Sequence, residues 1–424
     1  SDQHCGGLGV TSGVGCSAAV YVSGWVGLAL VIGGHGGRHG GQPKRSSIGF
    51  AILGSLALEA AMTRVLLAGG GTAGHVNPLL AVAHELVRRG NCQQGEIRVL
   101  GTAQGLESRL VPAAGFELDT IARLPFPRRV DLYALAFWPR FAWAVVKVMN
   151  VLRTNKIELV AGFGGYASAP AYVAAWLMRK PCAVHEANSL AGFANRLGSR
   201  LTRFVATTFS LTQLPHARRL GMPLSRAITH PGKKVTKTSA RTHFGLSAKK
   251  KTLVVTGGSQ GSKRINATVE AIAADVVAIG WQILHIVGHK NSLPTSPPSG
   301  YVGIKYCDSM ELALGAATMV ISRAGAATVS ELQVMGLPAI FVPYPVGNGE
   351  QEKNAHDSVS AGSAVLVLDK DFTPDNFRAS VLPLLGDDAA IARMVASGKN
   401  LGDADAAGDF VDLMLQALDE GTPQ

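Results

Sequence analysis

The chain has 424 residues, of which 47% are hydrophobic and 16% charged, and this composition excludes a disordered chain. Its length is enough for two domains with separate cores. The formal net charge of +11 suits an anionic partner such as nucleic acid, an acidic membrane or a phosphorylated substrate, but simple surface solvation explains it equally well.

The first sixty residues differ in character from the rest of the chain. They are rich in glycine, and no charged residue occurs from Val14 to Ile32. That run is about long enough to span a bilayer, although Gly and Ser interrupt it; if it did span, the basic residues after it would leave the main body cytoplasmic. Our preferred interpretation is that residues 1–61 are an upstream extension and that the folded core begins at Met62.

From residue 63 onward, short apolar runs alternate with longer helical periods. This alternation is typical of βαβ units in a parallel, doubly wound sheet. We therefore expect an N-terminal domain over residues 62–225. Its strands are predicted at 64–68, 97–101, 157–161, 182–185 and 203–206, and its helices at 77–90, 104–114, 131–153 and 168–179.

A polar and basic segment, residues 226–251, interrupts the pattern and is predicted to be the linker between two domains. A second α/β series follows, which predicts a C-terminal domain over 252–424 with terminal helices from about 373 to 419. Its strands are expected near 252–256, 282–287, 318–321, 338–342 and 364–368. Because ligands bind outside the carboxyl ends of such strands, a cleft between the domains is the expected site.

The first of three glycine-rich turns covers residues 69–75 and follows the first strand. Asn77 and Pro78 are expected to start the helix after it, and its free N–H groups can receive an anion or a polar ligand. The string also fits the dinucleotide pattern G-x-G-x-x-G. A dinucleotide site requires an acidic residue after the second strand, which instead runs into Gly101 and Thr102, so this is the less favoured interpretation.

The second turn, residues 257–261, suits a phosphate held by backbone amides and by the hydroxyl of Ser259. It lacks the Gly-Lys-Ser/Thr ending of a P-loop, which argues against an ATPase. The third turn, residues 323–331, opens a helix with Glu331 about two turns in. Glu331 is expected to accept hydrogen bonds from a ribose diol, whereas a lone Glu would more simply be a buried or capping carboxylate.

Six segments in order, GGGTAGHVNP, GFGGYASAP, HEANSLAGFANR, GGSQGS, SRAGAATVSE and EQEKNA, resemble the signatures of the MurG family of glycosyltransferases. The resemblance covers roughly residues 63–420. It implies an α/β fold of GT-B type, with two Rossmann-like doubly wound domains facing a cleft. It also implies a metal-independent, inverting transfer of N-acetylglucosamine from UDP-N-acetylglucosamine to undecaprenyl-diphosphate-linked N-acetylmuramoyl-pentapeptide in peptidoglycan synthesis, without a cofactor.

By the same resemblance, a set of residues contacts the substrates. The sugar end of the site would be lined by Thr72, Ala73 and Gly74, with Tyr166 among the substrate-binding residues and Asn188 on the donor sugar. Ser259 would meet the diphosphate, and Cys307 would lie near uracil. The nucleotide would be bound by Ala326, Ala327, Thr328, Val329, Ser330 and Glu331, and the GlcNAc hydroxyls by Gln351. The family often has an Arg one position earlier than Arg226, so Arg226 departs from the pattern.

An inverting transfer needs a base that takes the proton of the acceptor and a stabiliser for the departing UDP. Since no paired carboxylates and no DxD metal-binding string stand out, helix dipoles and amides are the expected stabilisers. His75 is the candidate base because it sits at a helix start and its ordinary pKa is near neutral. A purely hydrogen-bonding role for His75 has equal standing, and Glu186 is the rival base.

Residues 123–153 mix aromatic with basic side chains, which suits an anionic bilayer surface, although part of the stretch must be an ordinary core helix. The aromatic members are Phe126, Phe137, Trp138, Phe141 and Trp143, and the basic ones Arg123, Arg128, Arg129, Arg140 and Lys147. Together with the family resemblance, this patch implies a peripheral protein on the cytoplasmic face of the membrane, with the cell-wall and division machinery as partners.

Two other functions remain as alternatives. One is another GT-B glycosyltransferase that acts on a lipid or antibiotic acceptor. The other is a non-enzymatic nucleotide-binding protein. No nucleic-acid partner is expected, because no aromatic-basic RNA motif or helix-turn-helix stands out.

Overall fold

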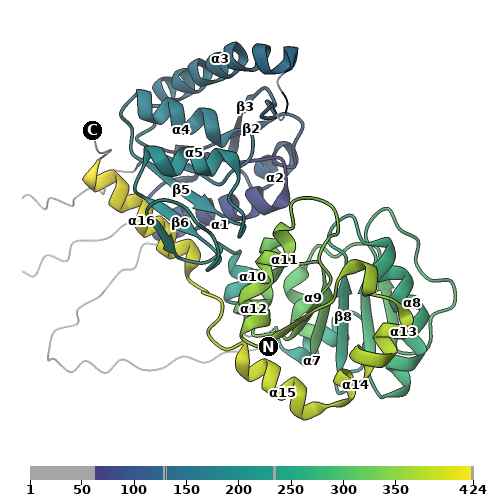
Figure 1. The fold of residues 1–424 in the computed structure, drawn as a ribbon. Coiled ribbons are helices and arrows are strands. Elements are labelled where there is room, and N and C mark those ends of the chain that lie inside the picture. Colours follow the sequence, from purple (N-terminus) through teal and green to yellow (C-terminus); the bar gives the residue numbers. More distant parts are fainter. Residues whose placement is uncertain (1–62, 128, 130, 233–234, 422–424) are drawn as a thin grey trace, which may run out of the picture. The chain divides into compact units, whose positions relative to one another are not determined.

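A computed structural model of the chain describes residues 63–421 except 128, 130, 233 and 234. The extension expected at 1–61 and Arg128 of the basic patch therefore lie outside the described residues. The first α/β series forms a seven-stranded parallel sheet in the order β3-β2-β1-β4-β5-β6-β7 (Figure 1). Its strands are β1 (Val65–Ala68), β2 (Ile97–Thr102), β3 (Glu117–Ile121), β4 (Leu159–Gly162), β5 (Cys182–Glu186), β6 (Val205–Thr207) and β7 (Ala217–Arg219).

Helices cover both faces of this sheet. One face carries α1 (Ala73–Arg89) and α2 (Glu107–Ala113), and the other carries α3 (Leu132–Thr154), α4 (Ser168–Leu177) and α5 (Phe193–Leu201). Helix α1 begins at Ala73, four residues before the predicted start, because Thr72 is already the extended N-cap residue. The prediction was wrong since Pro78 lies within the helix, where it removes only one backbone hydrogen bond.

The second series forms a six-stranded parallel sheet in the order β10-β9-β8-β11-β12-β13. Its strands are β8 (Thr252–Thr256), β9 (Gln282–Ile286), β10 (Tyr301–Ile304), β11 (Met319–Ser322), β12 (Ala339–Phe341) and β13 (Ala364–Leu366). Its helices include α8 (Lys263–Ala278), α9 (Met310–Ala316), α10 (Ala326–Val334), α11 (Glu350–Asn354) and α12 (His356–Ser360). After β13 follow α13 (Pro374–Asn376), α14 (Leu382–Gly386), α15 (Asp388–Ser397) and α16 (Ala406–Glu420). The two doubly wound sheets confirm the predicted α/β fold.

The predicted linker is only partly a linker. It contains α6 (Arg226–Thr229) and α7 (Lys237–His243), and α7 packs against α9. The guanidinium of Arg241 is buried and donates to the carbonyl oxygens of Ala316 and Ala248, 3.1 and 3.0 Å away, and to the hydroxyl of Thr318. The expectation of a linker is therefore corrected from residue 237 onward, because α7 packs on α9 and its Arg241 side chain is buried and hydrogen-bonded inside the C-terminal domain.

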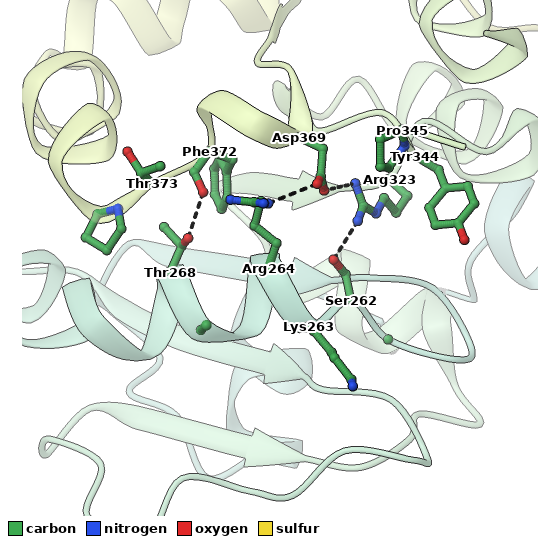
Figure 2. Close-up of a pocket in the computed structure, with 13 residues that line it drawn as sticks. Ser262, Lys263, Arg264, Thr268, Arg323, Tyr344, Pro345, Asp369, Phe372 and Thr373 are labelled. Atoms are coloured by element: carbon green, nitrogen blue, oxygen red, sulfur yellow. Dashed lines mark hydrogen bonds and ion pairs between the residues drawn. The ribbon is translucent and has the colours of Figure 1, made fainter. Parts of the chain in front are cut away.

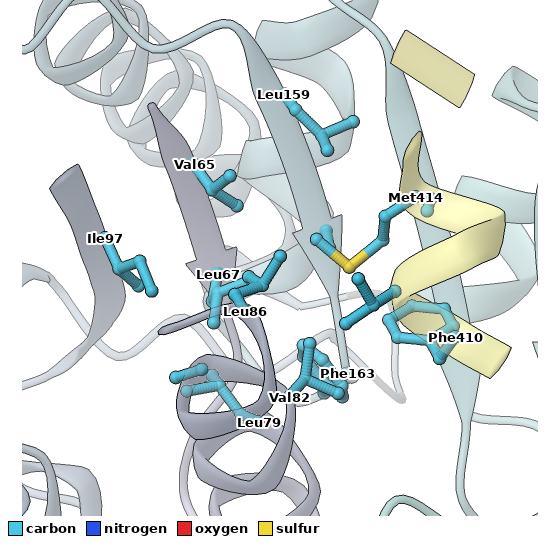
Figure 3. Packing of buried hydrophobic residues seen from close by; sticks show 14 of the residues in the cluster. Val65, Leu67, Leu79, Val82, Leu86, Ile97, Leu159, Phe163, Phe410 and Met414 are labelled. Atoms are coloured by element: carbon cyan, nitrogen blue, oxygen red, sulfur yellow. The ribbon is translucent and has the colours of Figure 1, made fainter. Parts of the chain in front are cut away.

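The last helix does not stay with the C-terminal sheet. Phe410 and Met414 of α16 are fully buried in the core that also holds Val65, Leu67 and Phe163 (Figure 3). The chain therefore returns to the N-terminal sheet, and the expectation that all terminal helices belong to the C-terminal domain is wrong for α16. Its apolar face was predictable, but not which sheet it would cover.

Candidate active site

A cavity of about 710 Å³ is lined from both α/β series. The loops after β1, β4 and β5 contribute from the N-terminal sheet, and the start of α10 and the loop before α11 contribute from the C-terminal series. This is the expected place for a ligand, outside the carboxyl ends of parallel strands. Seven of the predicted site residues line it together: Thr72, Gly74, His75, Tyr166, Glu186, Asn188 and Ala326.

A buried carboxylate, that of Glu107, supports the first glycine turn through a hydrogen bond. Glu107, fully buried at the start of α2, accepts hydrogen bonds from the N–H of Gly71 at 2.8 Å and from the N–H and hydroxyl of Thr102 at 2.8 and 2.7 Å. Burial alone would raise the pKa of Glu107, but these hydrogen bonds bring it below its ordinary value. The sequence analysis missed Glu107, because its role depends on the contact with Gly71 rather than on a motif.

Glu107 also bears on the dinucleotide interpretation. It is an acidic residue shortly after β2, but its carboxylate is turned inward. A Cβ placed on Gly70 would meet its Oε1 at 2.4 Å, so the carboxylate fills the space behind the turn. A ribose has no access to a carboxylate that is buried and already bonded to three donors, and the structure thus argues against a dinucleotide here.

Two glycine turns of the N-terminal sheet meet backbone to backbone. Gly165, in the turn after β4, has φ +83°, and a Cβ built on it would lie 2.4 Å from the carbonyl oxygen of Gly70. Only glycine combines this backbone conformation with so close an approach. The contact fixes the loop of Tyr166 beside the loop of His75.

His75 is oriented by the turn that precedes it. Its Nδ1 lies 3.0 Å from the carbonyl oxygen of Gly70 and 3.3 Å from the hydroxyl of Thr72. A carbonyl oxygen only accepts, so Nδ1 carries the proton in the neutral ring and Nε2 keeps its lone pair. His75 is partly exposed and lines the cavity, which is the arrangement that a general base requires.

Glu186, the rival base, is committed to its own loop. Its carboxylate accepts from the N–H of Asn188, from the N–H of Gly192 and from the amide of Asn195, each at 2.9 Å, and the residue is 2% exposed. Both oxygens of this carboxylate are therefore engaged in holding the loop that follows β5. The geometry favours a positioning role for Glu186.

Asn188 lies where the two series of the chain meet. The N–H of the next residue, Ser189, donates to Oδ1 of Asn354 at 2.8 Å, and the Nδ2 of Asn354 lies 3.4 Å from Oδ1 of Asn188. Asn354 also donates to the carbonyl oxygen of Ala324, at 3.3 Å, in the third glycine-rich turn. Asn354 is fully buried and was not predicted as a site residue.

The third turn offers free donors at the start of α10. Gly325 is the N-cap, and the N–H of Val329 already donates to its carbonyl at 2.9 Å. The N–H groups of Ala326, Ala327 and Thr328 have no partner within the helix. The side chain of Val329 is fully buried in the core. Ser330, 3% exposed, lies beside another cavity.

The remaining predicted residues lie outside the lining of this cavity. Arg226 and Ser259 are exposed. Cys307 is buried in the core, and burial raises the pKa of its thiol. Gln351 accepts from the N–H of Tyr344 at 2.9 Å. Glu331 is partly buried in α10, and burial raises its pKa to about 7.

Arg323 ties together the turns of the C-terminal sheet (Figure 2). It donates to the hydroxyl of Ser262, the N-cap of α8, at 2.7 Å, and to the carbonyl oxygens of Val342 and Pro343 at 3.0 and 2.9 Å. It also pairs with Asp369 at 2.6 Å. One side chain thus connects the second turn, the third turn and the end of β12. Arg323 also lines a second cavity, of about 730 Å³, in the C-terminal series.

Within the described part of the chain, no group of three or more His, Cys, Asp or Glu side chains is placed to hold a metal ion.

Comparisons with known proteins agree with this architecture. Residues 65–207 match the glycosyltransferase family 28 N-terminal domain, and residues 252–409 match the glycosyltransferase family 28 C-terminal domain. A Clavibacter michiganensis protein, UDP-N-acetylglucosamine--N-acetylmuramyl-(pentapeptide) pyrophosphoryl-undecaprenol N-acetylglucosamine transferase, is 51% identical over 358 residues, covering 84% of this chain and 97% of its own. A Streptomyces coelicolor protein of the same name is 42% identical over 360 residues, covering 84% and 98%.

Among solved structures, MurG from Acinetobacter baumannii is similar with a TM-score of 0.69 and 26% identity, covering 84% of this chain and 99% of that protein. Both halves of the chain thus match, in sequence and in fold, one kind of two-domain transferase. The chain belongs to glycosyltransferase family 28 and, within it, to the MurG family of GT-B glycosyltransferases.

Proposed function

We propose that this protein transfers N-acetylglucosamine from UDP-N-acetylglucosamine to undecaprenyl-diphosphate-linked N-acetylmuramoyl-pentapeptide, in the synthesis of peptidoglycan. The names of its relatives support this donor and this acceptor. The observation that carries the proposal is the cavity lined by both α/β series. It brings His75, which follows β1, together with the start of α10, which follows β11.

The donor half of the site uses backbone amides and the helix start. The free N–H groups of Ala326, Ala327 and Thr328 take the diphosphate, where the dipole of α10 favours negative charge. Glu331 accepts from the ribose hydroxyls, and Ser259, Cys307 and Gln351 complete the donor contacts by family resemblance. Arg226 has no side-chain contact in the structure that assigns it a role.

The reaction is a single displacement at the anomeric carbon of the donor sugar. Nε2 of His75 takes the proton of the acceptor hydroxyl while that oxygen forms a bond to the carbon. The bond from the carbon to the phosphate oxygen breaks, and UDP leaves with the electron pair. Attack from the face opposite to the leaving group inverts the anomeric configuration, and the α10 amides stabilise the charge that develops on UDP.

The acceptor half requires access to a lipid, and α3 supports a peripheral contact with the membrane. Leu132, Leu135, Trp143 and Val146 are 84%, 72%, 72% and 53% exposed, and their spacing places them on one side of the helix. Arg140 and Lys147, seven residues apart, flank this apolar stripe. Such a helix binds an anionic bilayer surface through apolar burial and charge together.

Among the described helices, α3 alone is long and apolar enough to cross a membrane; its most apolar stretch has a mean hydropathy of 1.2 and is 28% buried. One such helix is weak evidence for a span. Its inner side, including Val145, Val148 and Leu152, packs in the core of the N-terminal sheet, which favours a helix that lies on the membrane surface. We therefore propose a peripheral location on the cytoplasmic face, with cell-wall and division proteins as partners.

A transfer assay with UDP-N-acetylglucosamine and a short-chain lipid acceptor analogue, with EDTA and no added metal, tests the proposal. We expect one N-acetylglucosamine to be added with β-1,4 linkage. Transfer only to an antibiotic aglycone would support the alternative GT-B transferase, and UDP binding without transfer to any acceptor would support a non-enzymatic nucleotide-binding protein.

Vesicle binding tests the peripheral location. Trp143→Glu should reduce sedimentation with anionic vesicles, whereas Leu293→Glu, which alters another exposed apolar residue in the C-terminal series, should not. Equal binding by both variants would contradict the role of the stripe.

A further inference from the structure

We propose that four phenylalanines in the active-site cavity, called here the aromatic wall, bind the first isoprenoid units of the polyprenyl chain of the acceptor. This inference rests on the proposed function. The wall consists of Phe126, Phe137, Phe141 and Phe193, and all four line the same cavity as His75.

The wall is built from three separate elements. The rings of Phe126, in the loop after β3, and Phe193, the first residue of α5, stack with their centroids 3.9 Å apart at an interplanar angle of 28°. Phe137 of α3 meets Phe126 edge to face at 5.4 Å and stacks with Phe141 at 5.7 Å. The loop and α3, which follow one another in the chain, therefore meet the distant start of α5 in one continuous aromatic surface.

The two outer rings of the wall are exposed. Phe126 is 40% and Phe193 is 48% exposed, whereas Phe137 is buried and Phe141 is partly buried. Leaving apolar area in water costs free energy in proportion to that area, about 25 cal/mol per Å². Exposed aromatic rings gathered inside a concave site mark a surface that an apolar ligand covers.

Hydrogen bonds tie the described residues around Phe126 to the start of α3. The hydroxyl of Tyr133 in α3 donates to the carbonyl oxygen of Pro125 at 2.6 Å. Asp131 caps α3 by accepting from the N–H of Ala134 at 2.9 Å. The wall is thus preorganised, which reduces the entropy that binding would otherwise cost.

The lining of the cavity combines the polar residues His75, Glu186 and Asn188 with the aromatic wall. In the acceptor, a diphosphate alone separates the sugar from the polyprenyl chain. The chain must therefore begin within the length of a diphosphate from the reacting sugar, and an apolar surface is needed inside the site.

Arg123 lies in the same loop as Phe126, three residues before it. Its guanidinium is 5.0 Å from the centre of the Tyr166 ring, and Tyr166 lines the cavity. Arg123 is exposed at the surface, two residues after the end of β3. A cation at this point suits the diphosphate that joins the sugar to the first isoprenoid unit.

The experiment compares two acceptors in detergent solution. One carries a polyprenyl chain on its diphosphate, and the other carries only a methyl group. For Phe126→Ala and Phe193→Ala, we expect the KM of the polyprenyl acceptor to rise roughly tenfold, because each loses a ring face. The KM of the methyl acceptor and that of UDP-N-acetylglucosamine should stay within about twofold of wild type.

Trp176→Ala is the matched control, because Trp176 is 52% exposed on the same sheet but outside the cavity lining. It should change neither KM. Phe126→Leu should recover most of the loss if the wall acts through apolar contact.

Two outcomes would overturn the inference: an equal rise of KM for both acceptors, which indicates a structural role of the wall, and no rise for either. If wild-type protein glycosylates neither acceptor, the proposed function itself fails. The wall variants then have no bearing on that failure, so the two results are distinguishable.

Discussion

The Nδ1 of His75 and the carbonyl oxygen of Gly70 lie 3.0 Å apart, so the backbone of the glycine turn determines which ring nitrogen carries the proton. A turn that precedes a helix thereby selects the tautomer with a free Nε2. Two other residues support the same turn: Glu107 accepts from the N–H of Gly71, and Gly165 packs against the carbonyl oxygen of Gly70. The orientation of His75 therefore depends on contacts outside the motif that contains it.

We expect His75→Ala to lower kcat by roughly 10² to 10⁴-fold, the usual contribution of a general base, with little change in the KM of the donor. Steady-state kinetics at saturating acceptor measures this. Near-normal turnover would remove His75 from the role of base.

Glu186→Gln is the comparison for the same prediction. An amide NH₂ in place of a carboxylate oxygen faces N–H donors, so the melting temperature should fall, at a cost of about 1–3 kcal/mol. If Glu186 were the base instead, the variant would lose turnover without losing stability.

Gly165→Ala should destabilise the protein strongly. The added Cβ would lie 2.4 Å from the oxygen of Gly70, in a backbone with φ +83°. Gly280 has φ +86° with open space around it, so Gly280→Ala isolates the backbone strain of about 1–2 kcal/mol. Urea unfolding of the two variants should show a clearly larger loss for Gly165→Ala; equal losses would mean that the contact with Gly70 relaxes freely.

Arg323→Lys should raise the KM of UDP-N-acetylglucosamine by roughly tenfold and leave the KM of the acceptor unchanged. A lysine cannot reproduce the bonds to Ser262, Val342 and Pro343 at once, so the turns that receive the donor lose their common support.

Arg264→Lys is the matched control for the Arg323 variant. Arg264 shares the partner Asp369, at 3.0 Å, but is half exposed. Its replacement should cost little, as for other exposed ion pairs. Equal effects of the two variants would show that Asp369, rather than the tie between the turns, governs donor binding.

Glu331 predicts a pH dependence of donor binding. Burial raises its pKa to about 7, so the carboxylate that would accept from the ribose forms only as pH rises through 7. The KM of the donor should therefore fall between pH 6 and 8 in the wild type and stay flat in Glu331→Gln. A parallel pH profile in both proteins would contradict the assignment.

Two buried histidines predict loss of stability in acid. Burial lowers the pKa of His185 and of His285 to about 4, from 6.5. As pH falls from 6.5 to 4, the unfolded chain binds protons before the folded one, so unfolding becomes easier by at most about 3 kcal/mol per histidine. Urea unfolding from pH 7 to 4.5 measures this. A His285→Gln variant should lose about half of the dependence of the free energy of unfolding on pH. A slope unchanged by that variant would assign the acid sensitivity to other groups.

The central strands of both sheets were predictable because they are buried on both faces. Strand β1 reads VLLA and β8 reads TLVVT, continuous apolar runs that local sequence alone identifies. The edge strands β3, β7 and β10 were missed, because exposed or partly exposed side chains interrupt any continuous apolar run in them; every residue of β7 is exposed. The glycine turns were also predictable, because they follow directly on those central strands.

Local sequence determined the doubly wound halves, the three glycine turns and the candidate base, since each depends on neighbours a few residues away. Tertiary structure alone decided that α16 returns to the N-terminal sheet, that Glu107 supports Gly71 and that Arg323 joins the turns. It also separated His75, with a free nitrogen in the cavity, from Glu186, whose oxygens are occupied. The physical reason is that hydrogen bonds and burial are satisfied by residues far apart in the chain, and no pattern within one segment specifies those partners.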